Sequence, residues 1–126
     1  EAVRVVRAEA DALSTLAGAL ETSDRLQAAF ANAVATVLAT KGHLVVAGVG
    51  KSGHIGQKLA ASFASTGTPA FFMHPVEASH GDLGMLMEGC ALLAISHSGE
   101  SRELVDALRN LREVNPGKML GEELGQ

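Results

Sequence analysis

Residues 43–53, with the sequence HLVVAGVGKSG, contain the pattern that decides the fold. The stretch opens with a short apolar run rich in β-branched residues and ends in glycines interleaved with a lysine and a serine. A strand that is apolar on both faces is typical of a parallel sheet covered by helices on each side. Glycines directly after such a strand predict a tight turn into a following helix.

Helix and strand patterns alternate beyond this stretch. Ile55, Leu59 and Phe63 recur four residues apart, which predicts a helix over 52–65 with these side chains on its apolar face. The later elements are predicted as strands at 68–74 and 91–96, a short helix near 76–79 and a helix at 100–114. This alternation predicts an α/β three-layer sandwich, in which helices flank an open parallel sheet with right-handed crossovers.

Two helices are predicted ahead of this core. Over residues 1–20 the apolar residues recur at spacings of three and four, which places them on one face; they are Val3, Val6, Ala10, Leu13, Leu16 and Leu20. The second helix runs from a group of capping residues at 22–24 to about residue 40, with Asp24 and Gln27 as a loose capping box. Lys41 and Gly42 are expected to end it, with Gly42 free to turn left-handed.

These elements predict one domain over residues 1–126. It comprises an N-terminal helical hairpin (1–41), an α/β core (42–114) and an irregular tail (115–126). The apolar stripes of the first two helices need cover, so we expect them to form the interface of a homo-oligomer, a dimer or tetramer.

Composition excludes several classes of protein. The 126 residues carry a net charge of -4, which argues against the basic face that a nucleic-acid binder needs. Hydrophobic residues make up 47% of the chain, so a disordered chain is excluded. No apolar run reaches the roughly 20 residues that cross a bilayer, and no signal peptide is recognised. The one cysteine, Cys90, is expected to act as a small hydrophobe in a reducing cytoplasm.

Two loops at predicted strand ends carry most of the polar chemistry. They are residues 48–53 (GVGKSG) and 96–101 (SHSGES), and each leads into a helix. Ligands of open α/β sheets bind beyond the carboxyl ends of the strands. Free backbone N–H groups, the positive end of a helix and several hydroxyls favour a phosphate there. Lys51 adds a cation, while Gly50, Gly53 and Gly99 would let the backbone approach the ligand closely.

The sequence of the first loop is similar to two nucleotide-binding motifs. A Walker A motif is excluded, because Val45 stands where that motif needs a glycine. Gly48, Gly50 and Gly53 do match G-x-G-x-x-G, but no acidic residue ends the next strand to bind a ribose. A dinucleotide-binding domain is therefore the weaker alternative, and we expect no cofactor.

A family resemblance rests on residues 48–86 (GVGKSGHIGQKLAASFASTGTPAFFMHPVEASHGDLGML) and 94–108 (AISHSGESRELVDAL). Together they resemble the sugar isomerase (SIS) domain, and within it the D-arabinose 5-phosphate isomerases of the lipopolysaccharide sugar pathway. The resemblance implies a Rossmann-like, phosphosugar-binding sandwich that assembles as a homo-oligomer. It also implies interconversion of D-arabinose 5-phosphate and D-ribulose 5-phosphate, with a sugar phosphate as the ligand.

The resemblance also assigns site residues. The phosphate-binding serines of the family match Ser52, Ser96, Ser98 and Ser101, beside Gly50 and Gly99. The catalytic candidates are Lys51, His80 of the His-Gly-Asp-Leu-Gly motif, and Glu103. We expect Glu103 to be the base in a dry pocket, Lys51 to stabilise an oxyanion or phosphate, and His80 to shuttle a proton or hold a hydroxyl.

The remaining histidines are interpreted more simply. His54, His74 and His97 are expected to be structural or peripheral. A metal site made of His54, His80 and His97 would lack a regular ligand spacing, and we expect no metal.

The chain departs from the family after Leu111. The family domain continues there with two strand–helix units that bring a second glutamate and a histidine. Here residues 115–121 (NPGKMLG) are only weakly similar to that late stretch, with Asn115 in the histidine's place. We expect an omitted or deleted segment, and weak activity from a chain this short. The alternative function is a non-catalytic module that binds phosphosugars or nucleotide sugars.

Overall fold

The computed structural model describes residues 1–79, 82–87 and 89–114. Its elements, in order, are α1 (Ala2–Thr22), α2 (Asp24–Ala39), β1 (Leu44–Gly48), α3 (Lys51–Ser65), β2 (Ala70–Met73), α4 (Pro75–Ser79), the 3-10 helix η1 (Asp82–Met85), β3 (Ala91–Ile95) and α5 (Arg102–Val114). The predicted alternation is confirmed; η1 was not predicted. The chain divides into two compact units, Glu1–Ala35 and the residues from Thr36 onward.

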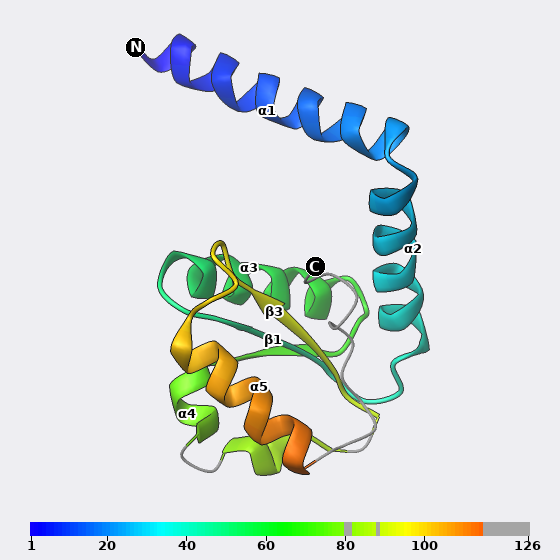
Figure 1. The fold of residues 1–126 in the computed structure, drawn as a ribbon, viewed down its shortest axis with the longest axis vertical. Helices are drawn as coiled ribbons and strands as arrows, with labels where there is room; N and C mark the ends of the chain where they lie inside the picture. Colours follow the sequence, from blue (N-terminus) through cyan, green and yellow to red (C-terminus); the bar gives the residue numbers. More distant parts are fainter. Residues whose placement is uncertain (80–81, 88, 115–126) are drawn as a thin grey trace. The chain divides into compact units, whose positions relative to one another are not determined.

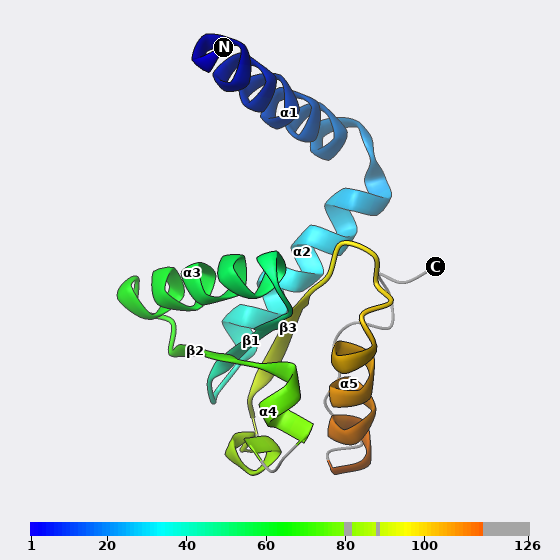
Figure 2. The same ribbon diagram turned by 90° about the vertical axis from the view of Figure 1, so that its left-hand side faces the viewer.

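The described strands form a parallel sheet with the order β2-β1-β3. β1 lies in the middle and is buried along its whole length. Figures 1 and 2 show α3 on one side of this sheet and α4 and α5 on the other. The α/β sandwich predicted from the alternating pattern is therefore confirmed.

The central strand supplies both halves of the core because its side chains alternate between the two faces. The cluster on the first face contains Leu44, Val46, Ala60 and Ala91. The cluster on the second face contains Val45, Met73, Ala78 and Ala107. Leu44, Val45 and Val46 are each at most 1% exposed, and burying such a side chain stabilises a fold by about 1.5–3 kcal/mol.

Helix α3 packs on the sheet through its small residues. The buried residues of α3 are Gly53, Gly56 and Ala60, whereas Ile55 is 58% exposed. The predicted stripe of Ile55, Leu59 and Phe63 is thus wrong for Ile55. The physical reason is that the glycines let the helix backbone come so close to β1 and β2 that its larger side chains lie beside the contact.

The junction before β1 also uses a glycine for close approach. Gly42 is not in the left-handed region, so the turn predicted for it is wrong. A Cβ atom at Gly42 would lie 3.0 Å from both the backbone nitrogen and the Sγ of Cys90. Cys90 is half-buried against the second cluster, and its Sγ accepts a hydrogen bond from the His43 N–H at 3.4 Å. Cys90 is therefore a packed small residue, as expected.

The N-terminal unit contains α1 and most of α2. Ser23 separates the two helices, and its Oγ accepts a hydrogen bond from the Leu26 N–H at 3.3 Å. Ser23, a member of the predicted capping group at 22–24, therefore caps α2, whereas Asp24 of the predicted capping box is the first residue of the helix. All residues of both helices are described, and none of them is buried. Within the described part of the chain, no helix is long and apolar enough to cross a membrane.

Candidate functional site

The two polar loops leave the sheet side by side. β1 and β3 are parallel neighbours, and Gly48 at the end of β1 pairs with Ile95 at the end of β3. The next residues, Val49 and Ser96, therefore open their loops at the same edge of the sheet. The register brings together the two segments that the sequence analysis singled out, because parallel strands present their carboxyl ends at one edge.

The first loop is a sharp turn into α3. Gly50 occupies the N-cap position with φ 60° and ψ -127°, a backbone conformation that favours glycine. Among the described residues, no atom would lie within 4 Å of a Cβ at Gly50, so they leave the space around it open. Glycine has no side chain with which to cap α3. The start of α3 therefore has the backbone geometry of an anion-binding helix end.

Gly53 has a different role from the one predicted for it. It is buried, and a Cβ there would lie 2.8 Å from the backbone oxygen of Gly48. A Cβ at Gly48 would likewise lie 2.9 Å from the backbone carbon and oxygen of Ser52. The lack of side chains at Gly48 and Gly53 thus lets β1 and α3 pack closely. Of these three glycines, only Gly50 has open space around it. Half-buried Ser52 lies in the same first turn of α3.

Lys51 is the first residue of α3 and is exposed to solvent. A cation at a helix N-terminus lies next to the positive end of the helix dipole, which is unfavourable. The first turn of α3 contains no acidic residue that would offset this charge. Lys51 therefore does not stabilise its helix, and its position suits the binding of an anion from solvent.

The second loop is ordered by its own serines. The Oγ of Ser96 accepts a hydrogen bond from the Gly99 N–H at 2.9 Å. The Oγ of Ser98 accepts one from the Glu100 N–H at 3.2 Å. Gly99 has φ 71°, which these turns require of it. Both hydroxyl oxygens are used as acceptors, which leaves their O–H groups able to donate to a phosphate.

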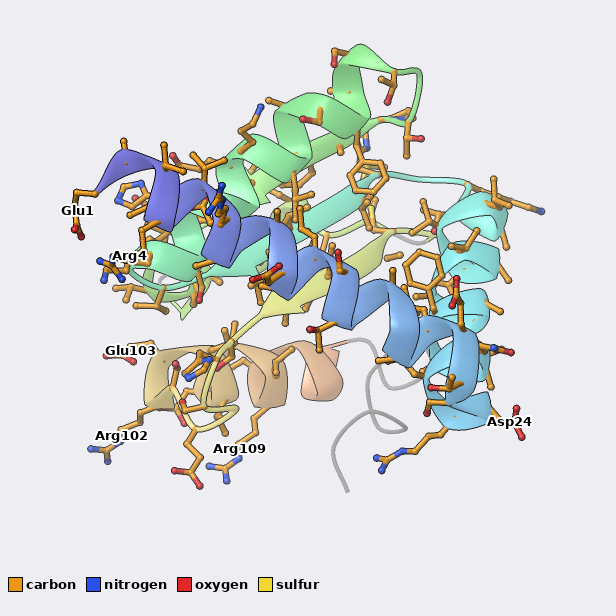
Figure 3. All side chains as sticks on the ribbon, turned by 90° about the horizontal axis from the view of Figure 1, so that it is seen from above. Glu1, Arg4, Asp24, Arg102, Glu103 and Arg109 are labelled. Atoms are coloured by element: carbon orange, nitrogen blue, oxygen red, sulfur yellow. The ribbon has the colours of Figure 1, made fainter. Side chains whose placement is uncertain are left out.

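Half-buried Ser101 directly precedes α5, and its backbone oxygen accepts the Val105 N–H at 2.9 Å. Glu103 lies in the first turn of α5. Figure 3 shows the side chains of Glu103 and Arg102 pointing away from the ribbon at this end of the helix. Glu103 is exposed, so the described residues alone form no dry pocket around it, and the predicted pocket stays a prediction. Glu103 lies one turn before the buried Ala107 on the same face of α5, so its exposure means that the described residues do not cover this end of the helix.

His80 lies outside the described residues, so its predicted role stays a prediction. His54 on α3 is exposed. His97 is exposed too, and it lies in the second loop, residues 96–101, which is called the serine loop below. His74 is structural, as expected: its Nδ1 accepts a hydrogen bond from the Val76 N–H at 3.3 Å. Among the described side chains no three potential metal ligands gather at one point.

The match to a known protein family agrees with the division of the chain into two compact units. A family model described as the SIS domain matches residues 37–121. The chain belongs to the SIS family. The match begins next to Thr36, where the second compact unit starts, and it includes both polar loops.

Two curated relatives of this SIS domain carry the name arabinose 5-phosphate isomerase KdsD. The one from Pseudomonas aeruginosa PAO1 is 48% identical over 113 residues, which cover 90% of this chain and 33% of the relative. The one from Escherichia coli K12 is 57% identical over 75 residues, which cover 60% of this chain and 23% of the relative. The SIS chain thus spans at most about a third of the length of these relatives.

Solved structures resemble this SIS domain in fold and sequence. A protein of Escherichia coli CFT073, solved in complex with arabinose 5-phosphate, is 38% identical with a TM-score of 0.69. The match covers 91% of this chain and 62% of that one. A structure from Bacteroides fragilis NCTC 9343 is also 38% identical, with a TM-score of 0.68 and coverage of 90% and 61%.

Two features of the candidate site were not predicted from the sequence. One is the mutual contact of Gly48 and Gly53, which the G-x-G-x-x-G spacing could have indicated, since such spacing also serves close strand–helix packing. The other is the use of the Ser96 and Ser98 hydroxyls within their own loop. Serines two or three residues before a glycine or helix start are common in turns, so this signal was present.

Proposed function

We propose that this SIS domain is the phosphosugar-binding part of an aldose–ketose isomerase that interconverts D-arabinose 5-phosphate and D-ribulose 5-phosphate. The observation that carries the proposal is the pairing of Gly48 with Ile95, which brings the glycine–lysine loop and the serine loop to one sheet edge. The names of the relatives, and the complex of the Escherichia coli CFT073 protein with arabinose 5-phosphate, support this substrate.

In this proposal both loops contribute groups that bind the ligand. The phosphate binds the O–H groups of Ser96, Ser98 and Ser101, while Gly99, whose N–H donates to the Ser96 Oγ, gives the loop its turn around the phosphate. The start of α3, at Gly50 and Ser52, offers further N–H and O–H donors. Phosphates bind well at helix starts because free N–H groups and the helix dipole both favour an anion.

The reaction needs a base and a group that stabilises negative charge. A base removes the proton from C2 of the open-chain aldose; its electron pair forms the C1–C2 double bond of an enediolate while the carbonyl electrons move to O1, which then takes a proton. Return of a proton to C1, with loss of the proton on O2, gives the ketose. We assign the base to Glu103, charge stabilisation to Lys51, and proton movement between oxygens or binding of a hydroxyl to His80.

A binding module without catalysis is the second candidate. The observation in its favour is the exposure of Glu103, because a general base works best where water is excluded. Incubation of the full-length protein with arabinose 5-phosphate, followed by an assay for ribulose 5-phosphate, separates the two. Turnover supports the isomerase. Stabilisation of the fold by the sugar phosphate without turnover supports the module, and neither effect would contradict both.

The serine loop should carry much of the phosphate affinity. Replacing Ser98 or Ser101 by Ala is expected to weaken binding of arabinose 5-phosphate by about 1 kcal/mol or more, through a lost hydrogen bond to a charged acceptor. Titration calorimetry measures the change, and Ser65→Ala, at the far end of α3, is the matched control. Unchanged affinity in both loop variants would remove the loop from the site.

We also propose that the protein is a cytoplasmic homo-oligomer that associates through α1 and α2. These helices expose large apolar side chains, including Val6 at 64%, Leu13 at 68% and Phe30 at 60%. Exposed apolar side chains in this number are costly in water and favour a self-complementary contact. The free Cys90 agrees with a reducing compartment.

The oligomer predicts a simple result in analytical ultracentrifugation. The full-length protein should sediment as a dimer or tetramer at micromolar concentration. Replacing Leu13 and Leu16 together by Glu should shift it to a smaller species, because charged groups would enter the apolar contact. A variant with Glu at Lys58, on the exposed side of α3, should sediment like the wild type. A stable wild-type monomer would contradict the proposal.

A further inference from the structure

His74 caps the start of α4 with both its side chain and its backbone. It follows Met73, the last residue of β2, and directly precedes the helix. Its Nδ1 accepts the Val76 N–H at 3.3 Å, and its backbone oxygen accepts the Ala78 N–H at 3.0 Å. Pro75, the first residue of α4, has no N–H to satisfy. His74 thus satisfies the donors of Val76 and Ala78 in a helix too short to be stable by itself.

α4 in turn supports α5. The two helices pack against each other below the sheet, as Figure 2 shows. Ala78 of α4 has no exposed surface, and Ala107 of α5 is 3% exposed in the same cluster. Small side chains at this contact let the helices lie close together, so a shift of α4 is passed on to α5.

α5 begins where the serine loop ends. Ser101 directly precedes the helix, Glu103 lies in its first turn, and Leu104 is only 5% exposed beside them. The placement of this end of α5 therefore sets where the hydroxyl of Ser101 and the carboxylate of Glu103 lie relative to the loop at Gly50.

We propose that His74 is a positioning residue of the phosphosugar site. Its Nδ1 fixes the start of α4, α4 fixes α5 through Ala78 and Ala107, and α5 holds the serine loop in its binding position. The inference rests on the proposed function, because it concerns how the same site is held. His74 does not touch the substrate in this proposal.

The chemistry of the acceptor gives a pair of matched variants. Nδ1 can accept a hydrogen bond only while it carries no proton. In His74→Asn, the side-chain oxygen takes the place of Nδ1 and can accept the Val76 N–H, as Asn does at many helix starts. In His74→Gln, the amide lies one atom farther out, near the place of Nε2. His74→Ala removes the acceptor altogether.

The experiment measures two properties of these variants in the full-length protein. Calorimetry should give an affinity for arabinose 5-phosphate about fivefold weaker in His74→Ala and His74→Gln, the worth of roughly one hydrogen bond. His74→Asn should restore the wild-type value. Amide hydrogen exchange should show lost protection in α4 and in the first turns of α5 in the first two variants, with recovery in His74→Asn.

The outcomes separate this inference from the function it rests on. Loss of protection in α4 alone, with α5 and the affinity unchanged, would mean that His74 only stabilises its own helix, and would overturn the inference. Equal behaviour of the Asn and Gln variants would overturn the role of Nδ1. Failure of the wild-type protein to bind the sugar phosphate would instead overturn the proposed function. Even then, loss of protection in both α4 and α5 in His74→Ala would support the proposal that His74 holds the serine loop through these two helices.

A histidine at the other end of the sheet serves as the control. His43 precedes β1, is exposed, and contacts Phe71 edge to face with ring centroids 5.6 Å apart. His43→Ala is expected to leave the affinity and the protection of α4 and α5 unchanged. Changes equal to those of His74→Ala would show that general destabilisation, rather than the cap, is being measured.

Discussion

Glu103→Gln should lower kcat for isomerisation of arabinose 5-phosphate by about 10²–10⁴-fold, the contribution typical of a positioned general base. The amide keeps the size and hydrogen-bonding capacity of the side chain but cannot take the proton from C2. KM should change little, because the phosphate is bound by the serine loop rather than by this carboxylate. Steady-state kinetics of the full-length protein, with quantified ketose, measures both constants.

Glu100→Gln is the matched control for this change. Glu100 lies just before α5, is exposed, and uses its backbone N–H, not its side chain, in the hydrogen bond to Ser98. The substitution removes the same charge at nearly the same place, so it tests whether the local potential alone matters. Activity that survives Glu103→Gln, or falls equally in both variants, would show that Glu103 is not the base.

Gly53→Ala should lower the free energy of unfolding by about 3 kcal/mol or more, at the upper end of the cost of overpacking. The added Cβ would lie 2.8 Å from the backbone oxygen of Gly48, and neither partner is a side chain that can rotate away. Strand and helix would have to separate at the point where the first loop turns. This cost is a large part of the roughly 5–15 kcal/mol that stabilises a domain, and denaturant unfolding measures it.

Substitutions at two other glycines test whether the cost in stability follows the closeness of the added Cβ to its neighbours. A Cβ at Gly56 would lie 3.0 Å from an edge carbon of the Phe72 ring, which can shift, so Gly56→Ala should cost less than Gly53→Ala. A Cβ at Gly84 would meet no atom of the described residues within 4 Å, so Gly84→Ala should be nearly neutral. A different order of the three would contradict the packing described for β1 and α3.

The strands were predictable because burial on both faces of β1 leaves a continuous apolar run in the sequence. The apolar face of α3 was not, because hydrophobic periodicity counts large side chains, whereas this helix packs through Gly53, Gly56 and Ala60. Periodicity therefore pointed to Ile55, which lies in solvent. Glycine spacing, considered as a packing signal, would have corrected the prediction.

The candidate site was predictable in its parts but not in its geometry. The pattern identified both loops, and the register of β1 and β3 places their beginnings side by side. The exposure of Glu103 could not be predicted, since a sequence pattern does not show what covers the first turn of α5. The His74 cap depends on one side-chain rotamer, which a sequence pattern does not specify.

The central place of β1 also affects how the chain is synthesised. β1 leaves the ribosome before its neighbours β2 and β3, whose pairing begins only at Ala70 and Ala91. At about 5–20 residues per second, β1 waits several seconds for β3, with one of its two edges unpaired. Parallel pairing between segments distant in sequence is also slow, because long loops must close first. The nascent chain is thus most prone to aggregate, and most in need of a chaperone, between the synthesis of β1 and that of β3.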